Sequence, residues 1–206
     1  MKMSTATSLI LKCPFCGATK EVVKPNPEIT PGGILWSDGV YEDPMIPQPS
    51  PVQHCPECGG YYLLDEAESH ECDHETDALG RVSLLDTKYI YLQYKEVELT
   101  EEQRTILYMT IIRAFNDEFR MYPDSVFLEG AGLSRIDRIR GELLTFKNVD
   151  IILKGELLRE RRRYGESIAM LEKAKKEQPE KSWIIDQIIE QAKNHNDKVF
   201  QLRMAK

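Results

Sequence analysis

Cys13-Pro14-Phe15-Cys16-Gly17 recurs further along the chain as Cys55-Pro56-Glu57-Cys58-Gly59. Two residues between a pair of cysteines allow a tight turn to aim both sulfurs at one metal ion, about 2.3 Å away in the case of zinc. The glycine after each pair permits the positive φ that closes such a turn. Two such turns supply four thiolates and leave no open position for water. The sequence therefore predicts one structural Zn²⁺ per chain, with the ligands Cys13, Cys16, Cys55 and Cys58.

Two alternatives to zinc use the same four cysteines, namely an iron centre and a pair of redox dithiols. Spacing alone does not separate Zn²⁺ from an iron centre with four thiolates. A redox dithiol usually opens a helix in a thioredoxin-like unit, and neither pair follows a βαβ pattern, so we prefer a metal site.

The fifth cysteine lies in His70-Glu71-Cys72-Asp73-His74. We interpret this stretch as a solvated acidic linker with a reduced thiol. The alternative is a second metal site, because His70, Cys72 and His74 would share one face of a strand.

The segment between the two pairs exceeds the usual spacing of about 15–20 residues, which predicts an insertion within a zinc-ribbon-like module over residues 1–80. Eight of the 11 prolines lie between Pro14 and Pro51. Proline excludes long helices there, because it removes a backbone donor and clashes with the preceding turn. Residues 34–41 predict a hairpin with Asp38-Gly39 at its turn. Residues 44–51 are predicted to be extended.

Residues 81–206 are nearly free of proline and glycine and predict an all-α domain. Thr100 and Gln103 form a capping-box signal ahead of a helix over about 101–121. Ser134 and Ser182 are expected to cap two further helices. Two more helices are predicted over about 149–162 and 165–176, and helix is favoured over strand in 81–99. The predicted fold class is thus α+β, a small β module followed by an all-α region.

Residues 163–179 are similar to the second half of a tetratricopeptide repeat. The aromatic, small, large apolar, alanine and proline positions of that motif are held by Tyr164, Ser167, Leu171, Ala174 and Pro179. Gly155 takes the small position of the preceding helix, where it would let the two helices approach closely. Ile151 and Lys154 replace the usual tryptophan and leucine. We predict one repeat over about 148–181, followed by a capping helix.

The chain as a whole resembles a group of bacterial proteins that combine an N-terminal zinc ribbon with a C-terminal tetratricopeptide-like region. The matching residues are Trp36-Ser37-Asp38-Gly39, Pro44-Met45-Ile46-Pro47, Cys55-Pro56-Glu57-Cys58 running into Leu64-Asp65-Glu66-Ala67, Asn116-Asp117-Glu118-Phe119-Arg120, and Glu156-Leu157-Leu158-Arg159 with Tyr164. The resemblance covers most of residues 10–200. It implies this architecture and no particular activity.

Charge is spread unevenly along the 206 residues, whose net charge is −7. Residues 1–80 hold 4 Lys and Arg against 13 Asp and Glu, whereas residues 81–206 hold 23 against 21. An acidic first half argues against nucleic-acid binding there. The run Arg159-Glu160-Arg161-Arg162-Arg163 invites a nucleic-acid interpretation, but a solvated loop or a patch that docks the acidic half fits as well. No apolar run approaches the roughly 18 residues of a membrane span, and the start lacks an export signal, so we expect a cytoplasmic protein.

No catalytic motif for nucleotide, ester or peptide chemistry occurs in the sequence. The leading hypothesis is an interaction or adaptor protein whose helical region binds an unknown protein or peptide. One alternative is a nucleic-acid-associated zinc ribbon. Another is an enzyme with a cleft between the two halves, lined by Trp36, Asp38 or Asn116. We expect Asn116, Asp117 and Arg120 to form a buried polar tie to the zinc half rather than a catalytic set.

Overall fold

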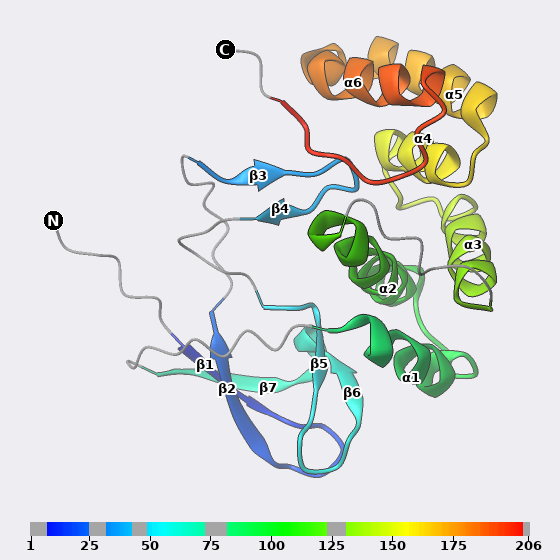
Figure 1. Ribbon diagram of the computed structural model, residues 1–206. Helices are drawn as coiled ribbons and strands as arrows, with labels where there is room; N and C mark the ends of the chain where they lie inside the picture. Colours follow the sequence, from blue (N-terminus) through cyan, green and yellow to red (C-terminus); the bar gives the residue numbers. More distant parts are fainter. Residues whose placement is uncertain (1–7, 25–31, 43–48, 73–81, 123–130, 204–206) are drawn as a thin grey trace, which may run out of the picture. The chain divides into compact units, whose positions relative to one another are not determined.

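The structure is a computed structural model that describes residues 8–24, 32–42, 49–72, 82–122 and 131–203. Small antiparallel sheets form in the N-terminal half and helices in the C-terminal half, so the protein is of the α+β class (Figure 1). The chain divides into two compact units. The first, called the cysteine unit here, contains Met1–Gly33 and Glu42–Leu99. The second, called the helical unit, contains Ile34–Tyr41 and Thr100–Lys206.

The cysteine unit is built from two small antiparallel sheets. One has the strand order β2-β1-β7 and the other pairs β5 with β6. Each cysteine pair lies in the loop of a hairpin, the first between β1 and β2 and the second between β5 and β6. The strands are β1 (Ser8–Lys12), β2 (Thr19–Val23), β5 (Val52–His54), β6 (Tyr61–Leu63) and β7 (Glu68–Cys72).

Helix α1 (Leu84–Tyr94) completes the cysteine unit and follows the short 3₁₀ turn η1 (Leu64–Glu66) and strand β7 in the chain. Ser83 and Asp86 cap it reciprocally, so the helix favoured for residues 81–99 is confirmed. The Gln93 side chain exchanges two hydrogen bonds with the backbone of Tyr61, at 3.1 and 2.6 Å. Tyr94 Oη donates to the same carbonyl at 2.9 Å. These bonds attach α1 to strand β6.

The helical unit contains five α-helices among the described residues. They are α2 (Glu101–Met121), α3 (Ala131–Leu143), α4 (Ile151–Glu160), α5 (Tyr164–Glu177) and α6 (Ser182–Lys193), with the 3₁₀ turn η2 (Pro179–Lys181) before α6. The Thr100–Gln103 capping box and the helix over 101–121 are confirmed. The predicted caps at Ser134 and Ser182 are wrong, because α3 begins upstream of Ser134 and Ser182 is itself the first residue of α6.

One hydrophobic core cluster of the helical unit lies where α4, α5 and α6 meet. Gly155 of α4 faces Leu171 of α5 so closely that a Cβ atom at Gly155 would be 2.5 Å from Leu171 Cγ. Ser167 Oγ donates a 2.7 Å hydrogen bond to the Gly155 carbonyl across the same contact. The close helix approach predicted at Gly155 is therefore confirmed. The buried members of this core are Ile152, Leu171, Ala174, Ile185, Ile188 and Ile189.

The predicted hairpin is present as β3 (Ile34–Leu35) and β4 (Tyr41–Glu42), with Gly39 at φ +78° in its turn. Its assignment to a continuous module over residues 1–80 differs from the structure, in which Ile34–Tyr41 groups with the helices. The reason is pairing with a segment distant in the sequence, since Ser37 and Leu35 share backbone hydrogen bonds with Phe200 and Leu202. Conversely, α1 groups with the cysteine unit. One cut near residue 80 therefore does not reproduce the two units.

None of the helices in the described part of the chain combines the length and apolar character that a membrane crossing requires. The predicted extended stretch at 44–51 lies mostly outside the described residues. His74 also lies outside them.

Candidate metal centre

The two cysteine turns have the same backbone hydrogen bonds. In the first, Cys13 N–H donates to the Ala18 carbonyl at 2.8 Å and Gly17 N–H donates to the Cys13 carbonyl at 2.9 Å. In the second, the corresponding bonds run from Cys55 to Gly60 and from Gly59 to Cys55, both at 2.9 Å. Gly17 and Gly59 adopt φ of +74° and +72°. A residue with a Cβ atom is strained at such φ, so glycine closes both turns.

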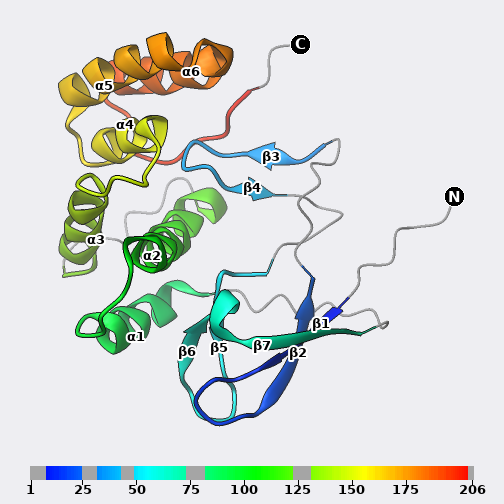
Figure 2. The same cartoon turned by 180° about the vertical axis from the view of Figure 1, so that it is seen from behind.

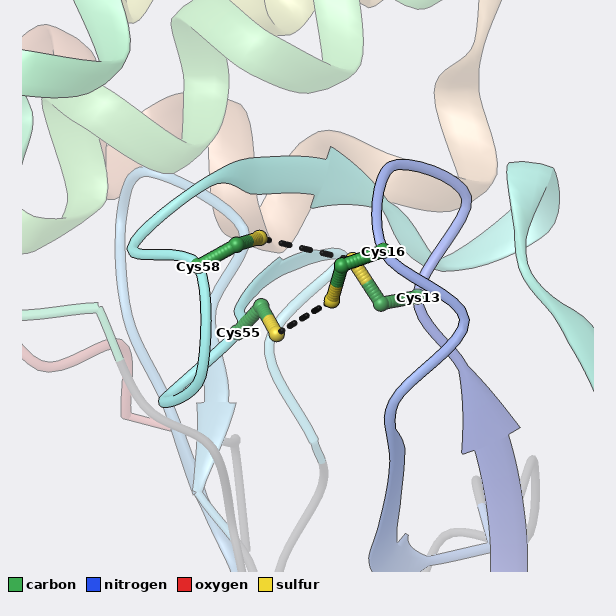
Figure 3. A group of neighbouring side chains, drawn as sticks. All are labelled: Cys13, Cys16, Cys55 and Cys58. Carbon is green, nitrogen blue, oxygen red and sulfur yellow. Dashed lines mark hydrogen bonds between the residues drawn. The ribbon is translucent and has the colours of Figure 1, made fainter.

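The four sulfurs point toward a common centre between the two turns (Figure 3). Cys13 Sγ lies 3.8 Å from Cys58 Sγ, and Cys16 Sγ lies 3.7 Å from Cys55 Sγ. All four sulfurs are within 4.8 Å of one another. Sulfurs bound tetrahedrally at 2.3 Å from one ion are separated by about 3.8 Å. The cluster therefore has the donor atoms and the spacing to hold one metal ion, and each turn contributes one partner to each close sulfur pair.

One sulfur of each turn is enclosed and the other faces solvent. Cys13 and Cys55 are only 3% and 2% exposed and pack against the fully buried Tyr62, whereas Cys16 and Cys58 are exposed. The two turns also contact each other, because the Phe15 ring lies so close to Gly60 that a Cβ atom there would be 2.8 Å from it. The site is thus anchored from one side by the sheets and open to solvent on the other.

The thiols influence one another's ionisation. Burial raises the pKa of Cys55, but backbone N–H groups of Cys58 and Glu57 and the neighbouring thiols outweigh it and lower the pKa to about 7. The Ala18 N–H lowers the pKa of Cys16, yet desolvation and hydrogen bonds with the other thiols raise it to about 12. One thiolate therefore suppresses ionisation of its neighbours. A divalent cation removes this conflict, since it stabilises all four as thiolates.

Four thiolates around a tetrahedral ion leave no coordination position for water or substrate. Such a centre cross-links two hairpins and does not activate a reactant. Among the described residues, no other group of Cys, His, Asp or Glu side chains converges in this way. His70 and Cys72 do alternate on β7, but Cys72 Sγ has the Glu21 carboxylate 4.0 Å away as its partner.

Asp38 and Asn116, considered as residues of a cleft between the halves, lie together inside the helical unit. Each is 1% exposed, and Asn116 Nδ2 donates to Asp38 Oδ2 and to Glu160 Oε1, both at 3.0 Å. Arg120 pairs with Asp38 and Asp117 and lies 5.2 Å from the centre of the Trp36 ring. The expected buried polar tie to the first 80 residues is present, since Asn116 and Arg120 both bind Asp38. The hairpin that carries Asp38 groups with the helices, however, and not with the cysteine turns.

The basic run at 159–163 is neutralised residue by residue within the helical unit. Arg159 and Glu156 form a fully buried pair, with Nε donating to Oε2 at 2.7 Å. Glu160 is buried against Arg140 at 2.7 Å. The remaining arginines of the run pair with separate carboxylates: Arg161 with Asp137, Arg162 with Asp197 and Arg163 with Glu166.

Sequence reasoning missed the buried Glu156, Arg159 and Glu160 because their charge suggested a solvated surface. A usable signal was present. With Ile152 these residues lie at spacings of four, seven and eight, which is one face of a helix. In the structure this face of α4 is buried, and the charges on it are balanced by Arg140 and by one another.

No protein-family model, curated protein or solved structure matches the chain. The candidate site is therefore interpreted from its own geometry.

Proposed function

We propose that this protein is a zinc-stabilised adaptor. In this view the cysteine unit is a zinc-ribbon-like module held by one structural Zn²⁺, and the helical unit binds a protein or peptide partner. The single observation that carries the proposal is the convergence of four sulfurs from two matching turns, with close pairs at 3.7 and 3.8 Å. A closed four-thiolate site has a structural role, so the function is sought in surfaces rather than in chemistry at the metal.

The cysteine unit has good reason to need a metal. Its sheets are formed by strands of three to five residues, and β5 and β6 pair only with each other among the described residues. An isolated two-stranded hairpin is at best marginally stable in water. Binding of Zn²⁺ to small four-ligand sites contributes on the order of 10–16 kcal/mol, which is free energy of folding. One ion bound by both turns would thus fix the two hairpins in a single arrangement.

The arrangement of α4 and α5 supports a tetratricopeptide-like hairpin. Its small residues, Gly155 and Ser167, form the contact between the helices, and Leu171 and Ala174 are buried in the core below it. Pro179 then ends the pair and α6 packs as the next helix. Stacked helix pairs of this kind present extended surfaces on which they bind peptides and proteins.

Metal analysis of protein purified without added metal tests the first part. We expect one zinc per chain and no visible absorption, which an iron centre with four thiolates would show. The variants Cys16→Ser and Cys58→Ser, at the two exposed ligand positions, should lose the metal. Cys72→Ser is the matched control and should retain it, because Cys72 lies outside the cluster. A folded, metal-free wild-type chain would contradict the proposal.

Cross-linking of the full chain in extracts of its source organism tests the second part. A protein partner whose cross-links map to residues 100–203 is the expected result. Cross-links confined to the cysteine unit, or to nucleic acid, would contradict a helical adaptor surface.

A further inference from the structure

The segment after α6, residues 196–203, is extended and lies against three other parts of the helical unit. It runs beside β3 and past α4 and α6, as both views show in red (Figures 1 and 2). An isolated antiparallel bridge pairs Gln201 with Trp36. The segment contains no helix, so its backbone donors and acceptors depend on partners elsewhere in the unit.

One edge of the segment is bound as an additional strand. Leu202 N–H donates to the Leu35 carbonyl at 2.8 Å, and Ser37 N–H donates to the Phe200 carbonyl at 2.9 Å. Phe200 N–H also donates to Ser37 Oγ at 3.2 Å. Main-chain pairing with the edge of a hairpin is the mode by which many domains take up an extended peptide.

The helices hold the backbone of the segment at both ends. Gln187 of α6 accepts from Arg203 N–H at 2.8 Å and donates Nε2 to the Arg203 carbonyl at 3.0 Å. Arg159 of α4 donates to the Asn196 carbonyl. These contacts are made to the main chain, so they accept any extended segment in this register, whatever its side chains.

Apolar side chains of the segment fill positions between these clamps. Phe200 packs against the core of α4, α5 and α6, with the Arg159 guanidinium 5.1 Å from its ring centre. Val199 and Leu202 are buried, whereas Gln201 and Arg203 are exposed. The helical unit therefore favours a segment with the pattern Val-Phe-x-Leu, in which the polar residues are exposed. Backbone clamps combined with pockets for particular side chains are how a peptide-binding site achieves both affinity and specificity.

We propose that residues 196–203 are an internal ligand that occupies the peptide-binding site of the helical unit. A partner that carries an extended apolar-apolar-polar-apolar stretch takes the same place and displaces the segment. This inference rests on the adaptor function proposed above and names the class of partner, an extended peptide rather than a helix. The tether is short, because Asn194 and His195 alone separate the segment from the end of α6 at Lys193. The segment therefore competes at a high effective concentration.

The test cuts the link between residues 196–203 and α6 in the otherwise complete chain. A protease recognition sequence is inserted between Asn194 and His195, which are both exposed. After cleavage, a fluorescent peptide with the sequence of residues 196–203 is added and its anisotropy is measured. We expect saturable binding to the cleaved protein with unchanged helical circular dichroism, and apparent binding to uncleaved wild type that is weaker by roughly 100-fold. A matched peptide carrying Leu202→Asp should bind at least about 30-fold more weakly than the native peptide, because the buried position of Leu202 would enclose a carboxylate.

A second variant tests the inference if the protein with the inserted protease site does not fold. Phe200→Ala in the uncleaved chain weakens the internal segment, and the native peptide should then bind about 10-fold or more tightly than it binds the wild-type chain. The inference is overturned if cleavage unfolds the helices, if the peptide does not exchange, or if Phe200→Ala leaves peptide binding unchanged. In those cases residues 196–203 are a permanent strand of the fold. The adaptor proposal would then still be decided separately by the cross-linking of the native chain.

Discussion

Leu171 of α5 lies in the space that a side chain on Gly155 of α4 would need. A Cβ atom at Gly155 would be 2.5 Å from Cγ and 2.6 Å from Cδ2 of Leu171. Ser167 lies in the same contact and donates its hydroxyl to the Gly155 carbonyl. Leu171 and Ser167 are both fully buried. The approach of α4 and α5 therefore depends on an absent side chain on one helix and a small one on the other.

Gly155→Ala is expected to destabilise the helical unit. The added methyl group forces Leu171 out of a packed position, which costs about 1–3 kcal/mol. Alanine also favours the helix by up to about 1 kcal/mol relative to glycine, and this gain offsets only part of the loss. Urea unfolding followed by helical circular dichroism measures the difference in free energy of unfolding.

Gly165→Ala is the matched control, because Gly165 lies in the first turn of α5 and a Cβ atom there meets nothing within 4 Å. Its free energy of unfolding should stay the same or rise slightly. Equal effects of the two substitutions would mean that the contact with Leu171 does not limit the residue at position 155.

Arg159→Ala is expected to destabilise the helical unit strongly. Arg159 and Glu156 form an ion pair in which neither side chain is exposed. Loss of the guanidinium leaves the Glu156 carboxylate buried without its counter-charge, a change that costs about 3–5 kcal/mol. Thermal and urea unfolding of the variant measure this loss.

Arg163→Ala tests the same chemistry at the surface, since Arg163 pairs with Glu166 where both side chains are solvent-exposed. We expect a much smaller loss of stability there than for Arg159→Ala, because solvent screens an exposed ion pair. Similar losses in both variants would argue that burial does not set the strength of these pairs.

Features encoded by neighbouring residues could be predicted from the sequence. Thr100 and Gln103 are three residues apart and together cap α2, so a local pattern was enough to locate the start of this helix. The cysteine turns are also local, and their repetition indicated that the two pairs act together. Gly155 was found through its place in a repeated helical motif. In each case the sequence signal and the physical contact lie within a few residues, or follow a known period.

Features that depend on partners far away in the sequence could not be predicted in the same way. Asp38 meets Asn116 across 78 positions. The sequence suggested a buried role for Asn116 toward the first half of the chain, but it did not identify Asp38 as the partner. The hairpin at 34–41 was predicted to belong to the module over residues 1–80. In the structure, Leu35 is hydrogen-bonded to Leu202, near the other end of the chain. Ser134 had the chemistry of a cap, but the helix begins upstream of it. For the hairpin, tertiary pairing and not local preference decided which unit it joins.

Removal of the proposed metal ion is expected to affect the cysteine unit alone. Its four proposed ligands and the adjacent Tyr62 all belong to that unit, whereas both tryptophans of the chain, Trp36 and Trp183, belong to the helical unit. A chelator should therefore reduce the near-ultraviolet tyrosine signal and leave tryptophan emission unchanged. Added Zn²⁺ should restore the tyrosine signal. A parallel shift of tryptophan emission would show that the helical unit also depends on the metal.

Glu160→Gln is expected to change how stability depends on pH. Burial raises the pKa of Glu160 to about 7 despite the neighbouring Arg140, with Glu156 and Asp38 adding to the rise and Arg159 opposing it. A carboxyl whose pKa is higher in the folded state contributes its full stability below about pH 4.5 and loses it as the pH rises through 7. The free energy of unfolding of wild type minus that of the variant should fall between about pH 4.5 and 7, by at most about 1.4 kcal/mol per pH unit, and level off above pH 7. In the control Glu166→Gln, the Arg163 hydrogen bond lowers the pKa of the exposed carboxyl, so the difference should not fall with pH. A flat difference for Glu160→Gln would mean that Glu160 is ionised throughout this range, with Arg140 compensating its burial in full.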